Sequence, residues 1–231
     1  MKHKPLLAGT TLAALLVLQT SPVLAGDDGQ WVAVGPQCKV YLPWGGLVDP
    51  APTAVSQIAC KDGALAGAQT LDLDVQSGPA QKRSRVHVHF QAAFAAGKAN
   101  GHGVFVVRLE KDKFVPLRYV GGFADGLADG NGSLVYNEFF VQEGQFRGGE
   151  LNGYGRQYFT KQRCGGSEGE YANGKLEGTG ATTLCDAAKN IGKVMGNYHG
   201  GRLVGRGTWV HPDGSTTAVT QDANGEWQLA N

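Results

Sequence analysis

The chain has 231 residues, and its 21 Lys and Arg against 20 Asp and Glu give a formal net charge of +1. This balance argues against a nucleic-acid binder that relies on bulk charge. Glycine accounts for 36 of the residues, well above the usual share of about 7%. Many of these glycines recur in a tandem pattern, G-x-(Y/F)-x-x-G-x-x-x-G-x-G, so the pattern is the main guide to the fold.

The first 25 residues have the features of a secretory signal peptide. Lys2, His3 and Lys4 form a basic start, an apolar run extends from Leu6 to Leu18, and Val23-Leu24-Ala25 precedes Gly26. We therefore expect cleavage after Ala25 and a periplasmic or secreted protein. Removing residues 1–25 takes away Lys2 and Lys4 and no acid, which leaves 19 basic (21 − 2) against 20 acidic side chains and a net charge of −1.

Residues 26–89 are predicted to form an N-terminal cap that contains one degenerate copy of the glycine pattern. In this copy, over about residues 54–75, Cys60 takes the aromatic position and Gly63, Leu65 and Gly67 keep the expected phase. Gln69 stands in place of the last glycine. A terminal repeat that departs from the pattern is expected of a cap.

Residues 90–214 hold five further copies, each predicted to be a β-hairpin. The middle of every copy is a dipeptide suited to a two-residue turn with positive φ, such as Asp125-Gly126 or Asn173-Gly174. Counting outward from the turn places each aromatic opposite an apolar residue. The expected pairs are Phe94 with Ala99, Phe123 with Ala128, Phe146 with Leu151, Tyr171 with Leu176 and Tyr198 with Leu203.

Side chains alternate along a strand, so both glycines of each G-x-G share the face of that pair. We expect the ring of a neighbouring repeat to lie flat across this bare strip of backbone. The opposite face should be solvated, and the residues just after the turns make it a candidate docking face: Lys98, Glu150, Lys175 and Arg202.

Residues 215–231 are predicted to form a C-terminal capping hairpin around Asn224-Gly225. Because one hairpin cannot bury its apolar face, the fold class should be all-β, with tandem hairpins stacked into one elongated sheet or solenoid between the two caps. The glycine pattern and the Pro212-Asp213-Gly214 turn resemble MORN repeats. This resemblance implies a role in protein interaction, self-association or membrane attachment.

Four cysteines in an exported chain predict two disulfides, and the sequence alone allows three pairings. From the turn at Asn173-Gly174, Cys185 comes within two residues of a position opposite Cys164, and Gly165-Gly166 can absorb that offset as a bulge. We expect Cys164 to pair with Cys185 and, by elimination, Cys38 with Cys60.

Two sequence features could carry chemistry. His87, His89 and His102 are predicted to share the solvated face, with His102 diagonal to His89, which makes them weak candidates for a metal site. Gly165 to Gly169 matches the nucleophile motif G-x-S-x-G, but Ser167 leads into a strand where the motif needs a helix, so a hairpin connection is the better interpretation. We expect no cofactor.

The sequence thus predicts an exported, non-enzymatic scaffold or binding protein of the cell envelope. Its expected partner is an envelope protein or anionic lipid headgroups, with self-association possible in principle and no nucleic acid. The alternative is a hydrolase or metal-dependent enzyme with its site at His87, His89 and His102.

Overall fold

A computed structural model describes residues 29–44, 47–55, 57–77, 84–109, 117–161, 164–185 and 191–230. The predicted signal peptide lies outside these residues. The regular secondary structure of these residues consists of β-strands, which confirms the all-β prediction. No helix in these ranges is long and apolar enough to cross a membrane. The chain divides into an N-terminal unit (Pro22–Glu150) and a C-terminal unit beginning at Leu151.

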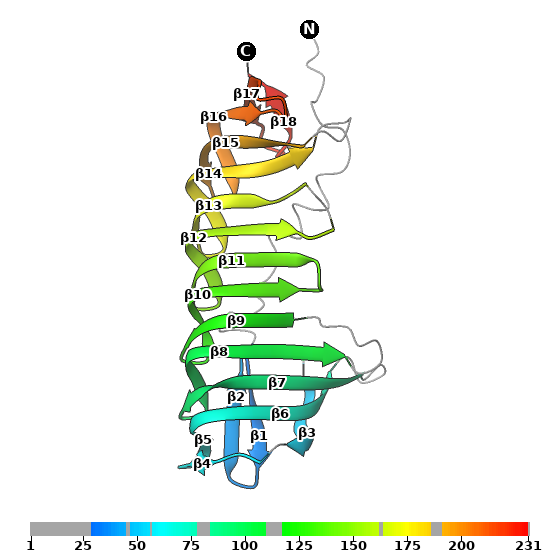
Figure 1. Cartoon of the computed structure of the whole chain (residues 1–231), viewed down its shortest axis with the longest axis vertical. Coiled ribbons are helices and arrows are strands. Elements are labelled where there is room, and N and C mark those ends of the chain that lie inside the picture. Colours follow the sequence, from blue (N-terminus) through cyan, green and yellow to red (C-terminus); the bar gives the residue numbers. More distant parts are fainter. Residues whose placement is uncertain are drawn as a thin grey trace. The chain divides into compact units, whose positions relative to one another are not determined.

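In the N-terminal unit, successive hairpins lie side by side in a sheet with the order β3-β6-β7-β8-β9-β10-β11 (Figure 1). A smaller sheet has the order β1-β2-β5-β4. The strands are β1 (Gln30–Gly35), β2 (Cys38–Leu42), β3 (Leu47–Val55), β4 (Cys60–Lys61), β5 (Ala64–Leu65), β6 (Gly67–Ser77), β7 (Ser84–Ala95), β8 (Lys98–Leu109), β9 (Leu117–Ala124), β10 (Leu127–Tyr136) and β11 (Phe140–Arg147).

In the C-terminal unit the strands also pair in chain order, and β17 with β18 forms a last antiparallel hairpin. The strands are β12 (Glu150–Phe159), β13 (Ser167–Ala172), β14 (Lys175–Cys185), β15 (Ile191–His199), β16 (Arg202–Val210), β17 (Thr216–Gln221) and β18 (Trp227–Leu229).

The repeats are hairpins with the turns expected from sequence. Asp125 and Gly126 have φ of 50° and 85°, and Asn173 and Gly174 have 50° and 73°, as a two-residue turn of this type requires. The strand register confirms the predicted pairing of aromatic and apolar residues in four repeats: Phe94 with Ala99, Phe123 with Ala128, Tyr171 with Leu176 and Tyr198 with Leu203.

Counting from the turn also assumed that the two strands of a hairpin pair residue by residue along their whole length, and this assumption is wrong. In the β9–β10 hairpin Ala128 pairs with Phe123 but Gly132 pairs with Gly121, so β10 advances four residues while β9 advances two. The register shifts at the corresponding place in three of the other repeat hairpins, β7–β8, β13–β14 and β15–β16. Each shift is a β-bulge that bends the hairpin. Because the offset is even, the side chains keep the faces predicted for them.

The two glycines of each G-x-G serve different purposes, which corrects the expectation that both underlie a neighbouring ring. The first has positive φ, 84° at Gly130 and 66° at Gly178, and a Cβ there would meet nothing within 4 Å. The second is tightly covered: a Cβ on Gly103 would stand 3.1 Å from the ring of Phe123, and one on Gly180 would stand 2.9 Å from Leu176. The cover is a neighbouring ring in the first case and the repeat's own leucine in the second.

The buried face is filled by aromatic and branched side chains. In the N-terminal unit the ring centroids of Phe90 and Phe105 lie 4.9 Å apart, and those of Tyr119 and Phe123 lie 5.1 Å apart, both edge to face. In the C-terminal unit Tyr171, Tyr198 and Trp209 are each at most 3% exposed. These side chains form the core that stacking of the hairpins requires.

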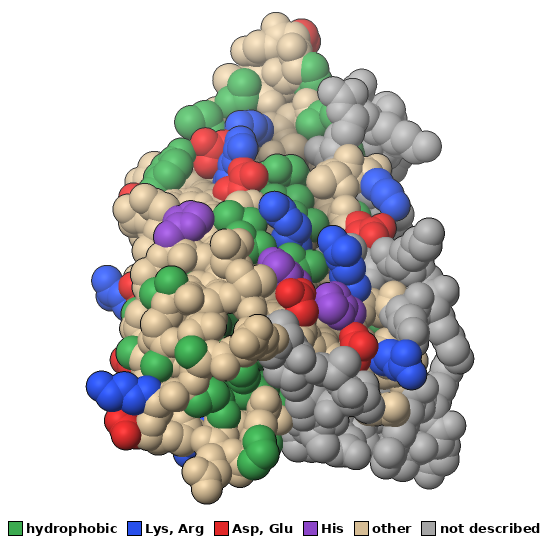
Figure 2. Space-filling view, turned by 60° about the horizontal axis from the view of Figure 1, so that its bottom comes forward, with side chains coloured by type: hydrophobic (Ala, Val, Ile, Leu, Met, Phe, Trp, Pro, Cys, Tyr) green, Lys and Arg blue, Asp and Glu red, His purple; other side chains and the backbone are tan. Residues whose placement is uncertain are grey.

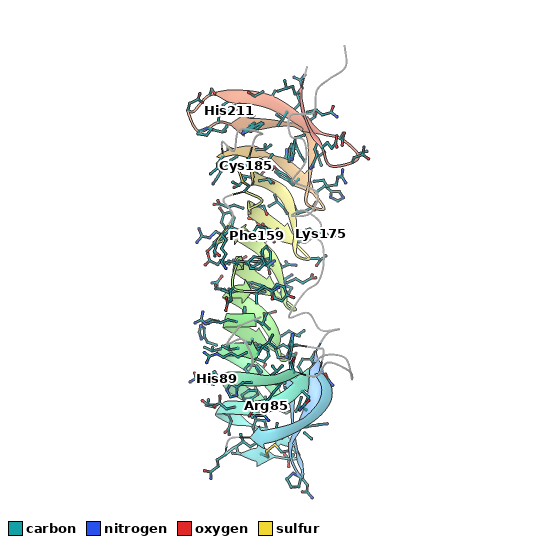
Figure 3. All side chains as sticks on the ribbon, turned by 90° about the vertical axis from the view of Figure 1, so that its right-hand side faces the viewer. Arg85, His89, Phe159, Lys175, Cys185 and His211 are labelled. Atoms are coloured by element: carbon teal, nitrogen blue, oxygen red, sulfur yellow. A yellow bond between two sulfur atoms is a disulfide. The ribbon has the colours of Figure 1, made fainter. Side chains whose placement is uncertain are left out.

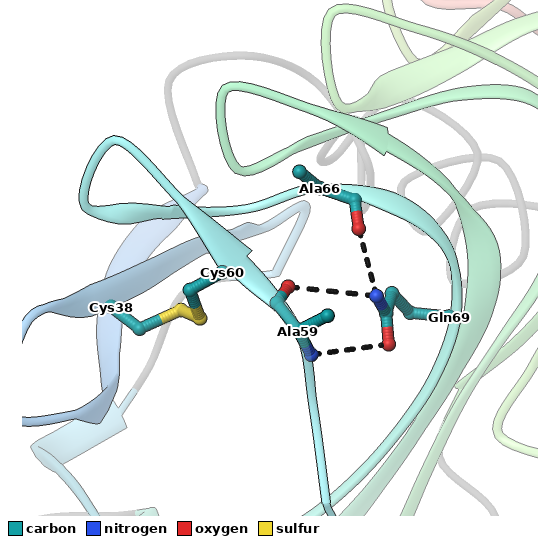
Figure 4. The surroundings of a disulfide bond; sticks show 5 residues. All are labelled: Cys38, Ala59, Cys60, Ala66 and Gln69. Carbon is teal, nitrogen blue, oxygen red and sulfur yellow. Dashed lines mark hydrogen bonds between the residues drawn. A yellow bond between two sulfur atoms is a disulfide. The ribbon is translucent and has the colours of Figure 1, made fainter.

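The degenerate copy also forms a hairpin, with Cys60 opposite Leu65 across the turn at Asp62-Gly63. Gln69, which replaces the last glycine, donates its amide to the carbonyl of Ala66 at 2.8 Å and lies close to the backbone of Ala59 (Figure 4). The Gln69 side chain, at the start of β6, therefore holds this strand against the preceding β4–β5 hairpin.

Both disulfides have the expected pairing. Cys38 is bonded to Cys60, which joins β2 to β4, and Cys164 is bonded to Cys185. Gly165 and Gly166 exchange backbone hydrogen bonds with Thr183 at 2.8 and 2.7 Å, so they hold the base of the β13–β14 hairpin beside the second bridge.

The two glycine roles can be separated by substitution. Gly178→Ala should cost about 1–2 kcal/mol because alanine is strained at positive φ, and Gly180→Ala about 1–3 kcal/mol because Leu176 leaves no space. Asn tolerates positive φ, so Gly178→Asn should regain part of the loss whereas Gly180→Asn should not. Urea unfolding measures the difference, with exposed Thr179→Val as the control; equal behaviour of the two asparagine variants would contradict the assignment.

The second disulfide should contribute to stability through the loop that it closes. Its cysteines are 21 residues apart, so replacing both Cys164 and Cys185 by serine should lower the free energy of unfolding by about 2–4 kcal/mol. Peptide mapping without reductant should recover the Cys164–Cys185 peptide. A peptide linking Cys60 to Cys164 would be incompatible with the fold.

Candidate functional site

The outer face of the N-terminal unit, opposite its core, carries a histidine–aspartate network. Asp72 Oδ1 lies 2.7 Å from His89 Nδ1 and 3.4 Å from His87 Nε2, and Asp74 Oδ1 lies 3.0 Å from His87 Nδ1. The four side chains meet because β6 pairs with β7 and places Asp72 opposite His89 and Asp74 opposite His87. Histidine, acidic and basic side chains also intermix on the face seen in Figure 2.

His102 does not join this network, so the prediction that it lies diagonal to His89 is wrong. The bulge in β8 places Val106 opposite His89, and His102 pairs with Gly122 of β9. The residues that face His89 and His87 are instead Asp72 and Asp74. Among the described residues, no group of three or more His, Cys, Asp or Glu side chains could hold a metal ion.

This outer face is not uniformly solvated as expected. Val106 and Val141 lie on it and are only 7% and 5% exposed. They belong to one cross-strand row in which His89 pairs with Val106 and Val106 with Arg118. The face therefore mixes charged and buried apolar positions.

The residues just after the turns differ in how strongly they are held. Lys175 is exposed and lies at the turn between β13 and β14 (Figure 3). Arg202 instead donates to the carbonyls of Asp222 and Ala223 at 2.8 and 2.7 Å, so it ties the last repeat to the capping hairpin. Lys98 and Glu150 are half-buried. A docking face built equally from all four residues is therefore not what the fold presents.

The outer face of the C-terminal unit exposes large apolar side chains among charges. Tyr154 on β12, Met195 on β15 and Val204 on β16 are 55%, 54% and 55% exposed. The ladder places them on one face, because Arg156 pairs with Glu168, Glu168 with Ala181 and Ala181 with Met195. We call this surface the outer patch, and it consists of Tyr154, Arg156, Glu168, Lys193, Met195 and Val204.

Glu168 organises the polar part of the outer patch. Tyr154 Oη donates to Glu168 Oε1 at 2.9 Å, and Lys193 Nζ lies 3.4 Å from Glu168 Oε2. The hydrogen bond from Tyr154, followed by the charge of Lys193, lowers the pKa of the Glu168 carboxyl, while the same bond raises the pKa of Tyr154. The carboxylate thus links β12, β13 and β15 side chains across the face.

The inner face of the C-terminal unit contains a polar row in which Gln157 pairs with Ser167 and Ser167 with Thr182. Ser167 Oγ lies 2.7 Å from Tyr171 Oη, and burial raises the pKa of that tyrosine. A cavity of about 50 Å³ opens beside this row. β13 begins at Ser167 and no helix follows it, so Ser167 is not part of a nucleophile elbow.

Sequence reasoning missed both the outer patch and the cavity. The alternation along β12 and β15 placed Tyr154 and Met195 on the outer face, where large apolar residues break the polar pattern. Ser167 and Thr182 break the apolar pattern on the inner face. These departures from the repeat pattern were the signals in the sequence that could have revealed the outer patch and the cavity.

The comparisons with known proteins identify the repeats. The model of the MORN repeat matches residues 90–106, 119–138, 143–162, 168–186 and 195–216. Among curated proteins, none matches the chain significantly in sequence. Five matched copies, each coinciding with a hairpin of the structure, show that the chain belongs to the MORN-repeat family.

Proposed function

We propose that this protein is an exported, non-enzymatic scaffold that docks a protein partner of the cell envelope through the outer patch. The observation that carries the proposal is the exposure of Tyr154, Met195 and Val204, each more than half exposed on one sheet face. Tyr, Met and Arg are enriched in protein interfaces, and tyrosine and arginine often dominate the binding energy. Arg156 lies beside these residues, with its guanidinium 5.4 Å from the ring centroid of Tyr158.

Export is supported by two features. All four cysteines are in disulfides, and such bonds persist in oxidising compartments. The sequence of residues 1–25 has the pattern of a signal peptide.

A protein partner suits the charges of the outer patch better than a lipid surface. Binding to anionic headgroups uses clusters of about four to eight Lys and Arg, whereas this face alternates Arg156 and Lys193 with Glu168 and Glu170. Side chains of both signs favour a partner with its own arrangement of charges. The alternative of a hydrolase or metal-dependent enzyme has less support, because its site was expected to combine three histidines and His102 lies apart from His87 and His89.

The outer patch can be tested by truncation. Tyr154→Ala with Met195→Ala should weaken capture of an envelope partner about 30-fold or more, the effect of losing a hot spot of 2 kcal/mol, while stability changes by about 0.5 kcal/mol per site. The matched control is Leu229→Ala, since Leu229 is 51% exposed but lies on the face of Val219. Pull-down from envelope extract and urea unfolding measure the two quantities.

Other occupants would be recognised in the same experiment. Retained capture by the double variant, or equal loss in Leu229→Ala, would contradict docking at the outer patch. Sedimentation of the wild type with protein-free anionic vesicles, abolished in the double variant, would replace the protein partner by a membrane. A concentration-dependent dimer that disappears in the double variant would replace it by a second copy of the chain.

A further inference from the structure

We propose that the cavity on the inner face of the C-terminal unit is a binding site for a small carboxylate group. It is lined by Gln157, Gly165, Gly166, Ser167, Gly174, Lys175, Leu176, Thr182, Gly200 and Gly201. The site lies on the opposite face of the sheet from the outer patch. The inference therefore does not depend on the proposed docking function.

The cavity exists because small polar residues interrupt the packing of the inner face. In the N-terminal unit the equivalent cross-strand row is Phe90, Phe105, Tyr119 and Leu134, all fully buried. In the C-terminal unit the row contains Gln157, Ser167 and Thr182, of which the last two are too short to fill the layer. A void of this kind costs stability because its lining loses packing contacts, so the short residues here are not explained by packing.

The walls are mostly bare backbone. Gly174, Gly200 and Gly201 belong to two successive turns, and a side chain on Gly200 or Gly201 would meet nothing within 4 Å. The floor is buried Gly165 and Gly166, which are held against Thr183 by backbone hydrogen bonds. The opening is consequently kept by turn and bulge geometry rather than by mobile side chains.

The polar groups favour an acceptor ligand. Ser167 lines the cavity, and its hydroxyl lies 2.7 Å from that of Tyr171. With Tyr171 as the donor in this pair, the hydrogen of Ser167 is left to donate to a ligand. Burial keeps the tyrosine neutral. Lys175 is the first residue after the turn at Asn173-Gly174, where it is exposed and lines the cavity. Its side chain starts on the outer face, but the long flexible stem can carry the ammonium around the hairpin tip to the mouth of the cavity.

Size and charge then select the class of ligand. A cavity of about 150 Å³ holds a benzene ring, so the 50 Å³ of this cavity excludes a ring and suits only the small polar head of a ligand, such as a carboxylate. The neighbouring acid, Glu177, does not compete, because it accepts from the Gly200 amide at 2.9 Å and contacts His199. The carboxylate can come from a small free acid or from the end of a peptide chain.

The test is an NMR titration of the amides of Gly165, Gly166, Gly200 and Gly201 with sodium acetate at constant ionic strength. We expect saturable shifts at millimolar concentration, and no saturation with acetamide. Lys175→Gln should weaken acetate binding about three- to fivefold, the size of an exposed ion pair, whereas Lys193→Gln, the same change at an exposed lysine that does not line the cavity, should not. Ser167→Leu, which fills the cavity, should abolish the shifts.

Equal titrations with acetate and acetamide, or an unchanged titration in a folded Ser167→Leu variant, would overturn the site. Equal effects of Lys175→Gln and Lys193→Gln would do so even if Ser167→Leu fails to fold. The source is distinguished with N-acetyl-glycyl-alanine and its C-terminal amide. Tighter binding of the acid form than of acetate indicates a chain end, whereas binding of acetate alone indicates a small free acid.

Discussion

Besides the ladders that join neighbouring hairpins, one backbone hydrogen bond per repeat holds the tip of each hairpin against the preceding one. The amide of the second turn glycine donates to the carbonyl of the apolar residue that faces the aromatic position of the preceding hairpin, which Cys60 occupies in the degenerate copy. In the N-terminal unit the bonds run from Gly97 to Leu65, from Gly126 to Ala99 and from Gly149 to Ala128, and in the C-terminal unit from Gly174 to Leu151 and from Gly201 to Leu176, each at 2.9 Å. A hairpin must bend for its tip to reach that carbonyl, and the bulge at the first glycine of G-x-G provides the bend. The turn, the bulge and the buried pair are therefore linked, because the hydrogen bond at the hairpin tip requires all three.

The same constraint explains the caps, because the first and last tips would otherwise leave backbone groups unpaired. In the N-terminal unit β2 runs along the tips: Tyr41 donates to the carbonyl of Gly97 at 2.8 Å and Lys39 to that of Gly63 at 3.2 Å. In the C-terminal unit the amide of Leu203 donates to the side chain of Gln221 at 3.0 Å, beside the bonds from Arg202 to the last hairpin. Each cap thus pairs backbone groups at the outermost hairpin tip of its unit.

The parts of the fold that could be predicted are local and periodic. The turn at Asn173-Gly174, the pair of Tyr171 with Leu176 and the bridge between Cys164 and Cys185 all follow from counting within one hairpin. The bulges could not be predicted, since a glycine in the sequence does not show whether it is needed for positive φ, as Gly178 is, or for close contact, as Gly180 is. The meeting of Asp72 with His89 depends on the register between β6 and β7, which no turn dipeptide specifies.

What distinguishes this chain from a uniform array lies where the repeat rules are broken. Stacking requires the glycines, the ring and its apolar partner, so these positions have little freedom to carry specificity. The C-terminal unit departs from the repeat pattern on both faces of its sheet. On the outer face Tyr154 and Met195 are large apolar residues at positions that are otherwise polar. On the inner face Ser167 and Thr182 place hydroxyls at positions that otherwise fill the core. Neither departure is needed for the hydrogen bonds that join the hairpins. These positions are therefore the ones that stacking leaves free to carry recognition.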